Sequence, residues 1–189
     1  MDSSGNIYFK NQLLIAMPHL ADPNFSHSVT YICEHNRYGA MGIVINLAST
    51  ATLGDVFDQL NISHASPKLA QQAVLAGGPV QINRGFILHK PKGNWEASLE
   101  TGNGIYLTVS KDVIEAIANN EGPDEFIIAL GYAGWAAGQL EEELAQNSWL
   151  TAPVDENILF HLPYESRWQA TAKAIGVDIN LLATQPGHA

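Results

Sequence analysis

The chain has 189 residues, of which 46% are hydrophobic and 15% are charged, a composition that is typical of a well-packed globular protein and excludes a disordered chain. Nineteen acidic residues against nine basic ones give a formal net charge of −10, which disfavours nucleic acid and anionic membranes as partners unless a basic patch compensates. The nearest candidate for such a patch is Arg84, Lys90 and Lys92, and three positive charges are too few to predict one.

Cysteine use and the lack of long apolar runs indicate the compartment. The single cysteine, Cys33, cannot form an internal disulfide, which favours a reducing environment. Residues 1–5 show no basic segment followed by an apolar one, so we expect no signal peptide. No apolar run approaches the roughly 18 residues that a membrane helix needs. We therefore expect a cytoplasmic protein with no membrane contact.

The first third of the chain reads as short strands joined by turns. Residues 12–16 form an apolar run that Pro18 ends, and the alternating pattern of residues 29–34 predicts a second strand. Residues 42–46 are continuously apolar, which predicts a buried strand paired with the second in an antiparallel hairpin. One face of the second strand would carry His27, Val29, Tyr31, Cys33 and His35.

The middle of the chain alternates helices with strands. Apolar residues at helical spacing predict helices over residues 53–60 and 110–120, with Thr52 and Ser110 as N-caps. Short apolar runs predict strands at residues 74–76, 86–89, 105–109 and 126–130. The glycine-rich segment 102–104 predicts a linker.

Helices dominate the last third of the chain. The glycines of residues 131–134 serve either a tight corner or a ligand-facing pocket, and the elements expected after them are a helix over 139–146, a strand at 149–150, a helix over 165–175 and a turn at 179–183. We expect the ends, residues 1–6 and 184–189, to be frayed. Because strand pairs dominate the front and helices follow without regular βαβ alternation, we predict one α+β domain over residues 1–189, built on a bent, largely antiparallel, barrel-like sheet flanked by helices.

The segment around the only cysteine is the strongest candidate for chemistry. On one face of a strand, the α-carbons of Cys33 and His35 would lie about 6.5 Å apart, so the imidazole could stabilise a thiolate. Arg37 is a second source of positive charge, whereas Glu34 acts in the opposite direction. With no second cysteine, oxidation would stop at a sulfenic acid, a mixed disulfide or an intermolecular bridge. The alternative is that Cys33 fills core space, because free cysteine is among the most buried residue types.

Other catalytic patterns are missing from the sequence. His27, Cys33 and His35 have the same strand parity, but without a Cys-x-x-Cys pair or a His-Glu-x-x-His helix they do not predict a metal site. No Gly-x-Ser-x-Gly elbow occurs, and the glycines at 77–78 and 102–104 lack the order of a phosphate loop. The sequence therefore predicts no cofactor and favours a protein that is not an enzyme.

Glycines and aromatic residues of the second half indicate a pocket. Small residues around Trp135 allow close backbone approach, which serves either core packing or a ligand-facing pocket. The candidate pocket-lining residues are Gly77, Gly78, Pro79, Arg84, Tyr132, Gly134 and Trp135. The acidic run Glu141-Glu142-Glu143 is explained most simply as carboxylates that complement the dipole at the start of a helix.

Several segments in a fixed order carry a family resemblance. They are Leu-Leu-Ile-Ala-Met-Pro at 13–18, Asp-Pro-Asn-Phe at 22–25, Cys-Glu-His at 33–35, Gly-Ala-Met-Gly at 39–42, Gly-Gly-Pro-Val at 77–80, Arg-Gly-Phe at 84–86, Gly-Tyr-Ala-Gly-Trp at 131–135 and Gly-Gln-Leu-Glu at 138–141. With them the chain resembles the YqgE/AlgH family of bacterial proteins over nearly its whole length. The resemblance implies a compact domain with a bent, almost barrel-like antiparallel sheet flanked by helices.

The family is often labelled as transcriptional regulators. That label fits poorly here, because the chain shows no helix-turn-helix pair and its net charge is wrong for DNA. The family's Cys-Glu-His segment falls on residues 33–35, which keeps a redox role as a hypothesis. We predict a non-enzymatic regulatory or interaction protein that binds a protein or a small ligand. The alternative is a thiol-based redox-responsive protein that uses Cys33, activated by His35 or Arg37.

Overall fold

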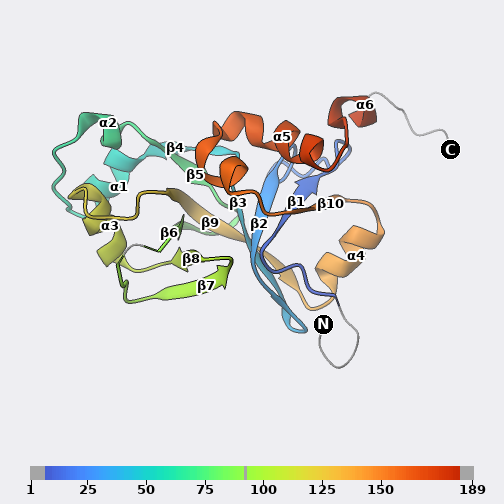
Figure 1. Cartoon of the computed structure of the whole chain (residues 1–189), viewed down its shortest axis with the longest axis horizontal. Coiled ribbons are helices and arrows are strands. Elements are labelled where there is room, and N and C mark those ends of the chain that lie inside the picture. Colours follow the sequence, from blue (N-terminus) through green and yellow to red (C-terminus); the bar gives the residue numbers. More distant parts are fainter. Residues whose placement is uncertain (1–6, 92, 184–189) are drawn as a thin grey trace.

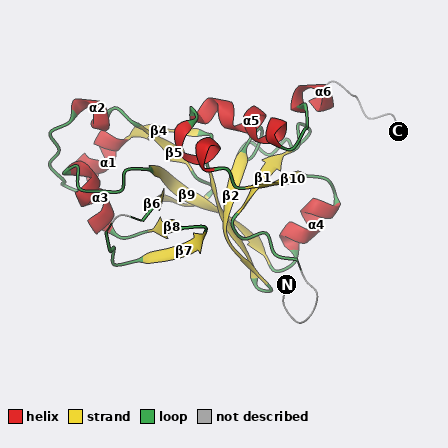
Figure 2. Ribbon diagram, viewed as in Figure 1, coloured by secondary structure: helices red, strands yellow, loops and turns green. Residues whose placement is uncertain are grey.

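A curled β-sheet organises the molecule. The computed structural model describes residues 7–91 and 93–183, and the fraying expected of residues 1–6 and 184–189 lies outside them. Within this part of the chain ten strands form one sheet, in the order β10-β1-β2-β3-β9-β6-β8-β7 with β4 and β5 beside that path, and helices pack against it (Figures 1 and 2). The ladders are antiparallel except that of β5 with β9. The predicted α+β class with a bent, largely antiparallel sheet is confirmed.

Two limbs of the sheet diverge from a long central strand, β9 (Phe126–Ala136). The first limb consists of β10 (Trp149–Pro153), β1 (Gln12–Ala16), β2 (Val29–Asn36) and β3 (Gly39–Val44). The second limb consists of β6 (Val80–His89), β8 (Ile105–Thr108) and β7 (Ser98–Gly102). The first half of β9 pairs with β6 and the second half with β3, so the two limbs curl toward each other as a half-barrel.

Short elements fill the rest of the chain. The helices are α1 (Leu53–Gln59), α2 (Pro67–Ala70), α3 (Lys111–Ala118), α4 (Gln139–Ala145), α5 (Arg167–Ala174) and α6 (Ile179–Ala183), with a π-helix at Asn157–His161 and a 3₁₀ turn at Tyr164–Ser166. The strands β4 (Ala48–Thr52) and β5 (Ala73–Ala76) pair with each other. Thr52 caps α1 as predicted, in a capping box with Asp55. Ser110 is the N-cap of α3, but its side chain makes no capping hydrogen bond. Its hydroxyl donates instead to the Asp112 carboxylate at 2.5 Å.

The concave side of the half-barrel holds the main core. Its fully buried members include Leu13, Tyr31 and Leu88, and α5 covers it through Trp168, whose indole donates to the Ala16 carbonyl at 3.0 Å. A second cluster lies under α1 and α3, and a third lies under α4. The Tyr31 hydroxyl lies 2.7 Å from the Thr101 hydroxyl of β7, which ties the two limbs together.

The glycines of 131–134 do not make a tight corner. The strand β9 continues to Ala136. Gly131, with φ of +76°, marks the point where the segment joining β5 to β6 crosses over β9. Residues 129 and 130 pair with β5 on one edge and with β6 on the other, so the segment joining β5 to β6 must pass across β9. A Cβ added at Gly77, Gly78 or Gly131 would stand 2.1 to 2.3 Å from backbone atoms, so only glycine permits this crossing.

The expected linker at residues 102–104 is a hairpin turn. Asn103 and Gly104 both have positive φ, 52° and 71°, and they join β7 to β8 where Gly102 pairs with Ile105. Asn-Gly is the preferred pair for such a two-residue turn. The sequence of β7, Ser-Leu-Glu-Thr-Gly, is too polar to predict a strand. The strand lies at the end of the sheet, where one side faces water.

Candidate functional site

Cys33 lies inside the main core. Its side chain is 0% exposed and belongs to the same cluster as Tyr31 and Leu88. Burial, and secondly the Glu34 carboxylate, raise the pKa of the Cys33 thiol. A reactive cysteine needs exposure and a lowered thiol pKa. The geometry therefore corresponds to the alternative in which Cys33 fills core space, and it lacks what the redox hypothesis requires.

A β-bulge in β2 separates Cys33 from His35. The pairing of β2 with β3 shifts between Ile32 and Glu34, which makes Cys33 the extra residue. After the shift His35 pairs with Ala40. Ala40 packs against the third cluster, under α4, whereas Cys33 belongs to the main core. The expectation that Cys33 and His35 share a face and meet is therefore wrong, because the inserted residue changes the alternation of the strand.

His35 is fixed by structural contacts of its own. The Phe9 backbone N–H donates to its Nδ1 at 2.9 Å, and its Nε2 lies 3.0 Å from Glu141 Oε1. Because Nδ1 accepts, the ring proton is on Nε2 and is donated to Glu141. The rings of Tyr8 and Phe9 pack against the imidazole, which is buried. His35 thus ties the segment before β1 to α4.

The acidic run at the start of α4 has specific partners. Glu143 Oε2 accepts hydrogen bonds from two indoles, that of Trp135 at 2.9 Å and that of Trp149 at 2.8 Å. Gln139 donates to the other oxygen of Glu143 at 3.0 Å. The dipole explanation is therefore incomplete, because Glu141 and Glu143 both anchor α4 on side chains of the sheet.

The two remaining candidates near the thiol are also engaged. Glu34 forms an ion pair with Lys10 at 3.1 Å. Arg37, in the turn between β2 and β3, places its guanidinium 4.7 Å from the centroid of the exposed Tyr38 ring. The β2 candidates therefore do not converge on one reactive centre. His27, the third member of the weighed metal set, packs its ring against Trp168.

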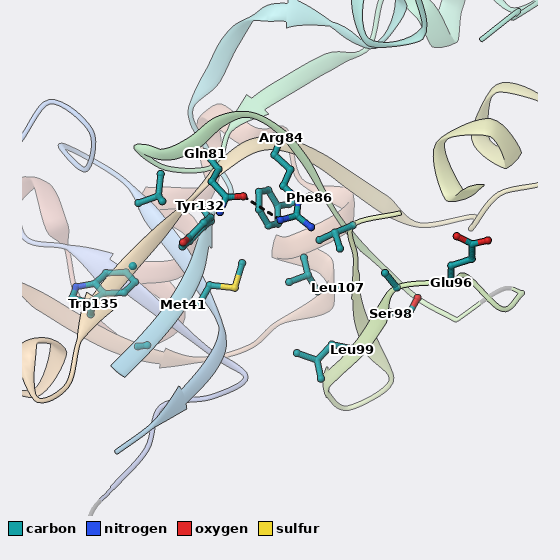
Figure 3. A pocket seen from close by; sticks show the side chains of 15 residues that line it. Met41, Gln81, Arg84, Phe86, Glu96, Ser98, Leu99, Leu107, Tyr132 and Trp135 are labelled. Carbon is teal, nitrogen blue, oxygen red and sulfur yellow. Dashed lines mark hydrogen bonds between the residues drawn. The ribbon is translucent and has the colours of Figure 1, made fainter. Parts of the chain in front are cut away.

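A groove of about 880 Å³ opens at the mouth of the half-barrel. It lies between β3 and the end of β9 on one side and the β7–β8 hairpin on the other (Figure 3). This volume falls in the range of about 300–1,000 Å³ that is typical of ligand sites. Its large apolar lining residues include Met41, Phe86, Leu99, Leu107, Tyr132 and Trp135. The groove continues the main core outward, since Phe86 and Leu107 belong to that core.

Few polar side chains face the groove. Arg84 donates to the Gln81 side-chain oxygen at 3.2 Å, and its guanidinium lies 5.7 Å from the centroid of the Phe86 ring (Figure 3). Within residues 7–91 and 93–183 the guanidinium has no carboxylate partner. Glu96 stands at the far end of the groove from Trp135. A charged, exposed guanidinium over an apolar surface is suited to an anionic group on an otherwise apolar ligand.

The predicted pocket residues divide into two groups. Arg84, Tyr132, Gly134 and Trp135 line this groove. Gly77 and Gly78 instead make the chain crossing over β9, and Pro79 follows them there. Their glycine pattern signals close backbone approach, which the sequence alone cannot distinguish from approach to a ligand.

Sequence reasoning missed the residues that give the groove its floor. Met41, Phe86, Leu99 and Leu107 come from four strands, and each reads as an ordinary core residue in its own segment. The available signal was Leu99, an apolar residue in a polar strand, which is 45% exposed. Of the basic residues considered from the sequence, Arg84 lines the groove, Lys90 pairs with Glu156, and Lys92 lies outside the described residues.

Two features are absent from the described residues. No group of three or more His, Cys, Asp or Glu side chains among them is placed to hold a metal ion. No helix among them is long and apolar enough to span a bilayer.

Comparison with known proteins gives consistent matches. A model of the AlgH-like family matches residues 13–180. A UPF0301 protein of Thioalkalivibrio sulfidiphilus is 54% identical over 189 residues, which are 100% of both chains. A UPF0301 protein of Saccharophagus degradans is 51% identical over 183 residues, which are 97% of this chain and 90% of that protein. The solution structure of the AlgH protein from Pseudomonas aeruginosa matches with a TM-score of 0.79 at 48% identity, covering 100% of both chains. A crystal structure from Corynebacterium diphtheriae, with a TM-score of 0.72 at 20% identity over 95% of this chain and 94% of that one, shares the fold.

Proposed function

This chain belongs to the AlgH-like family, and from that premise we propose that it is a non-enzymatic, cytoplasmic interaction protein whose ligand occupies the groove at the mouth of the half-barrel. The observation that carries the proposal is the apolar groove of about 880 Å³, bordered by Arg84, which has no carboxylate partner among the described residues. An apolar cavity with few polar groups is the usual form of a binding site. A cytoplasmic location agrees with the single, buried cysteine.

The polar lining supports binding over catalysis. Nucleophilic catalysis needs a base within hydrogen-bond reach of the nucleophile. The only hydroxyls among the described lining residues are those of Ser98 and Tyr132, and Ser98 bonds another hydroxyl, that of Thr108, at 2.6 Å. No histidine, cysteine or lysine lines the groove within the described residues. These side chains can orient a ligand but offer no evident route for a proton.

The same lining indicates the chemistry of the ligand. Apolar contacts would come from Met41, Phe86 and Leu107, while Arg84 would bind an anionic group such as a carboxylate. Glu96 would disfavour a second negative charge at the far end. The favoured ligand is therefore amphipathic, with one negative group beside an apolar body.

Anilinonaphthalene sulfonate tests this proposal, because the probe combines an apolar aromatic body with one anionic group. Fluorescence titration of the folded protein should show one saturable site. Arg84→Ala should weaken binding by about ten-fold, the loss expected for one charge-assisted hydrogen bond. Leu107→Asn should weaken it further, because it places an amide in the apolar floor.

Arg37→Ala is the matched control, since it removes an exposed arginine of the β2–β3 turn away from the groove. It should leave the dissociation constant within a factor of two. Equal binding by wild type, Arg84→Ala and Leu107→Asn, or no saturable binding at all, would contradict the assignment of the groove as the ligand site.

A further inference from the structure

The end of β9 is an unpaired strand edge inside the groove. Over residues 133–136 the strand pairs with β3 on one side. On the other side β6 reaches only to the pair of Val80 with Tyr132, and within the described part of the chain no strand pairs with β9 beyond that point. Such an edge presents backbone N–H and C=O groups that can pair with another extended chain.

The edge is open because β6 leaves the ladder. Between Val80 and Gly85 its register shifts, so residues 81–84 bulge away from β9, and Gln81 takes a positive φ of 50°. The bulge carries Arg84 to the border of the groove (Figure 3). Bulges commonly end pairing and re-aim side chains near binding sites. The same feature therefore exposes the strand edge and positions the cation.

Gly134 is the residue whose backbone groups face this opening. The Ala136 N–H donates to the Gln139 side chain at 2.9 Å and not to β3. Because backbone groups alternate between the two edges of a strand, the N–H and C=O of Gly134, two residues earlier, also point away from β3. Gly134 is exposed and lines the groove. A glycine in a strand is typical of sites where another backbone approaches closely.

We infer that the groove binds an extended peptide segment of a partner protein, which adds as a strand to the free edge of β9 and pairs with Gly134. This inference rests on the proposed function and specifies its ligand. Alternate side chains of the segment would enter the apolar floor around Met41 and Leu107, and a carboxylate would meet Arg84. A basic residue near Glu96 would complete the charge complementarity, which also suits the net charge of −10.

Selection of a phage-displayed library of random linear dodecapeptides on the wild-type protein tests the inference. We expect enriched peptides to alternate apolar residues, to carry at least one Asp or Glu, and to displace anilinonaphthalene sulfonate. Gly134→Pro removes the edge N–H while leaving the ladder with β3 in place, so it should weaken a selected synthetic peptide at least about ten-fold. Arg37→Ala, in the β2–β3 turn outside the groove, is the control and should change the affinity less than two-fold.

Hydrogen exchange of the wild-type protein gives a readout that does not depend on a variant. Saturation with the selected peptide should slow exchange of the Gly134 amide at least about ten-fold, because that N–H becomes a ladder donor. Unchanged exchange of Gly134 would overturn the inference, as would equal binding by Gly134→Pro. If the dye binds in an Arg84-dependent way but no peptide is enriched, strand addition is wrong and the proposed function stands. If neither binds, the proposed function fails as well.

Discussion

Two regions of the sheet differ in how their polar groups are used. In the first, around the end of β2 and α4, nearly every reactive side chain is already bonded: His35 to Phe9 and Glu141, and Glu143 to two indoles. In the second, the groove, no described strand pairs with the edge at Gly134, and the only described hydrogen-bond partner of the Arg84 side chain is a neighbouring amide. The first region contains residue types that are common in catalysis. The second region contains the backbone and guanidinium groups that can still form hydrogen bonds with a ligand.

From this difference we take accessible, unpaired groups as a better indicator of a site than residue type. A histidine whose two nitrogens are both bonded inside the protein must lose a structural contact before it can act on a ligand. A strand edge or a guanidinium without a carboxylate can gain a partner at no such cost. Variants in the first region should therefore affect stability, and variants in the second should affect binding.

The largest stability effect is expected at the crossing beside β9. In Gly78→Ala the new Cβ would stand 2.1 Å from the Tyr132 carbonyl carbon, at a φ of +150°. Backbone must move to relieve this contact, so we expect a loss of at least about 3 kcal/mol of unfolding free energy in urea denaturation. Gly134→Ala, whose Cβ would meet only a Tyr132 ring carbon at 3.4 Å, should lose no more than about 0.5 kcal/mol. Equal losses would remove the distinction between the two glycines.

The next largest effect is expected at the anchor of α4. Glu143→Ala leaves the indole N–H groups of Trp135 and Trp149 without an acceptor, at a cost of about 2–4 kcal/mol in unfolding free energy. Glu142→Ala is the control on the same helix, because Glu142 bonds only the exposed Gln146, and it should cost less than about 0.5 kcal/mol. If the two variants were equally stable, the carboxylate bridge would not hold α4.

A smaller, pH-dependent effect is expected from His89, which is buried at the end of β6. Its Nδ1 bonds the Lys90 carbonyl and its Nε2 lies 2.7 Å from the Thr108 hydroxyl. Burial lowers the pKa of His89, so the unfolded chain binds a proton more readily than the folded one below about pH 6.5. The unfolding free energy should therefore fall as the pH drops below about 6.5, and His89→Gln should flatten part of that slope in denaturation at pH 5 to 7. An identical slope in the variant would assign the acid sensitivity to other groups.

The smallest stability effect is expected at Arg84. Arg84→Ala removes one exposed hydrogen bond and should change the unfolding free energy by less than about 0.5 kcal/mol, while it weakens dye binding about ten-fold. Thermal denaturation measures the effect on stability, and the dye titration measures the effect on binding. A large loss of stability would mean that Arg84 belongs to the structural region after all.

Much of the fold followed from local pattern, whereas the assembly of the groove did not. The strand at 12–16 and the capping of α1 by Thr52 depend on neighbouring residues, so sequence periodicity finds them. The bulge at Cys33 depends on how β2 pairs with β3, and one inserted residue was enough to invert the expected relation to His35. The groove joins residues from five strands, and its exposed strand edge depends on where β6 leaves β9. No single segment of the sequence contains that information.

The most direct test of the account is an amide chemical-shift map of the wild-type protein during titration with anilinonaphthalene sulfonate. We predict that the largest shifts cluster on the groove, at Gly134, Leu99 and Leu107, while His35 and Glu141 stay unchanged. Shifts centred on the end of β2 and α4, with the groove unaffected, would contradict the central claim that the open groove and not the cysteine–histidine region is the binding site.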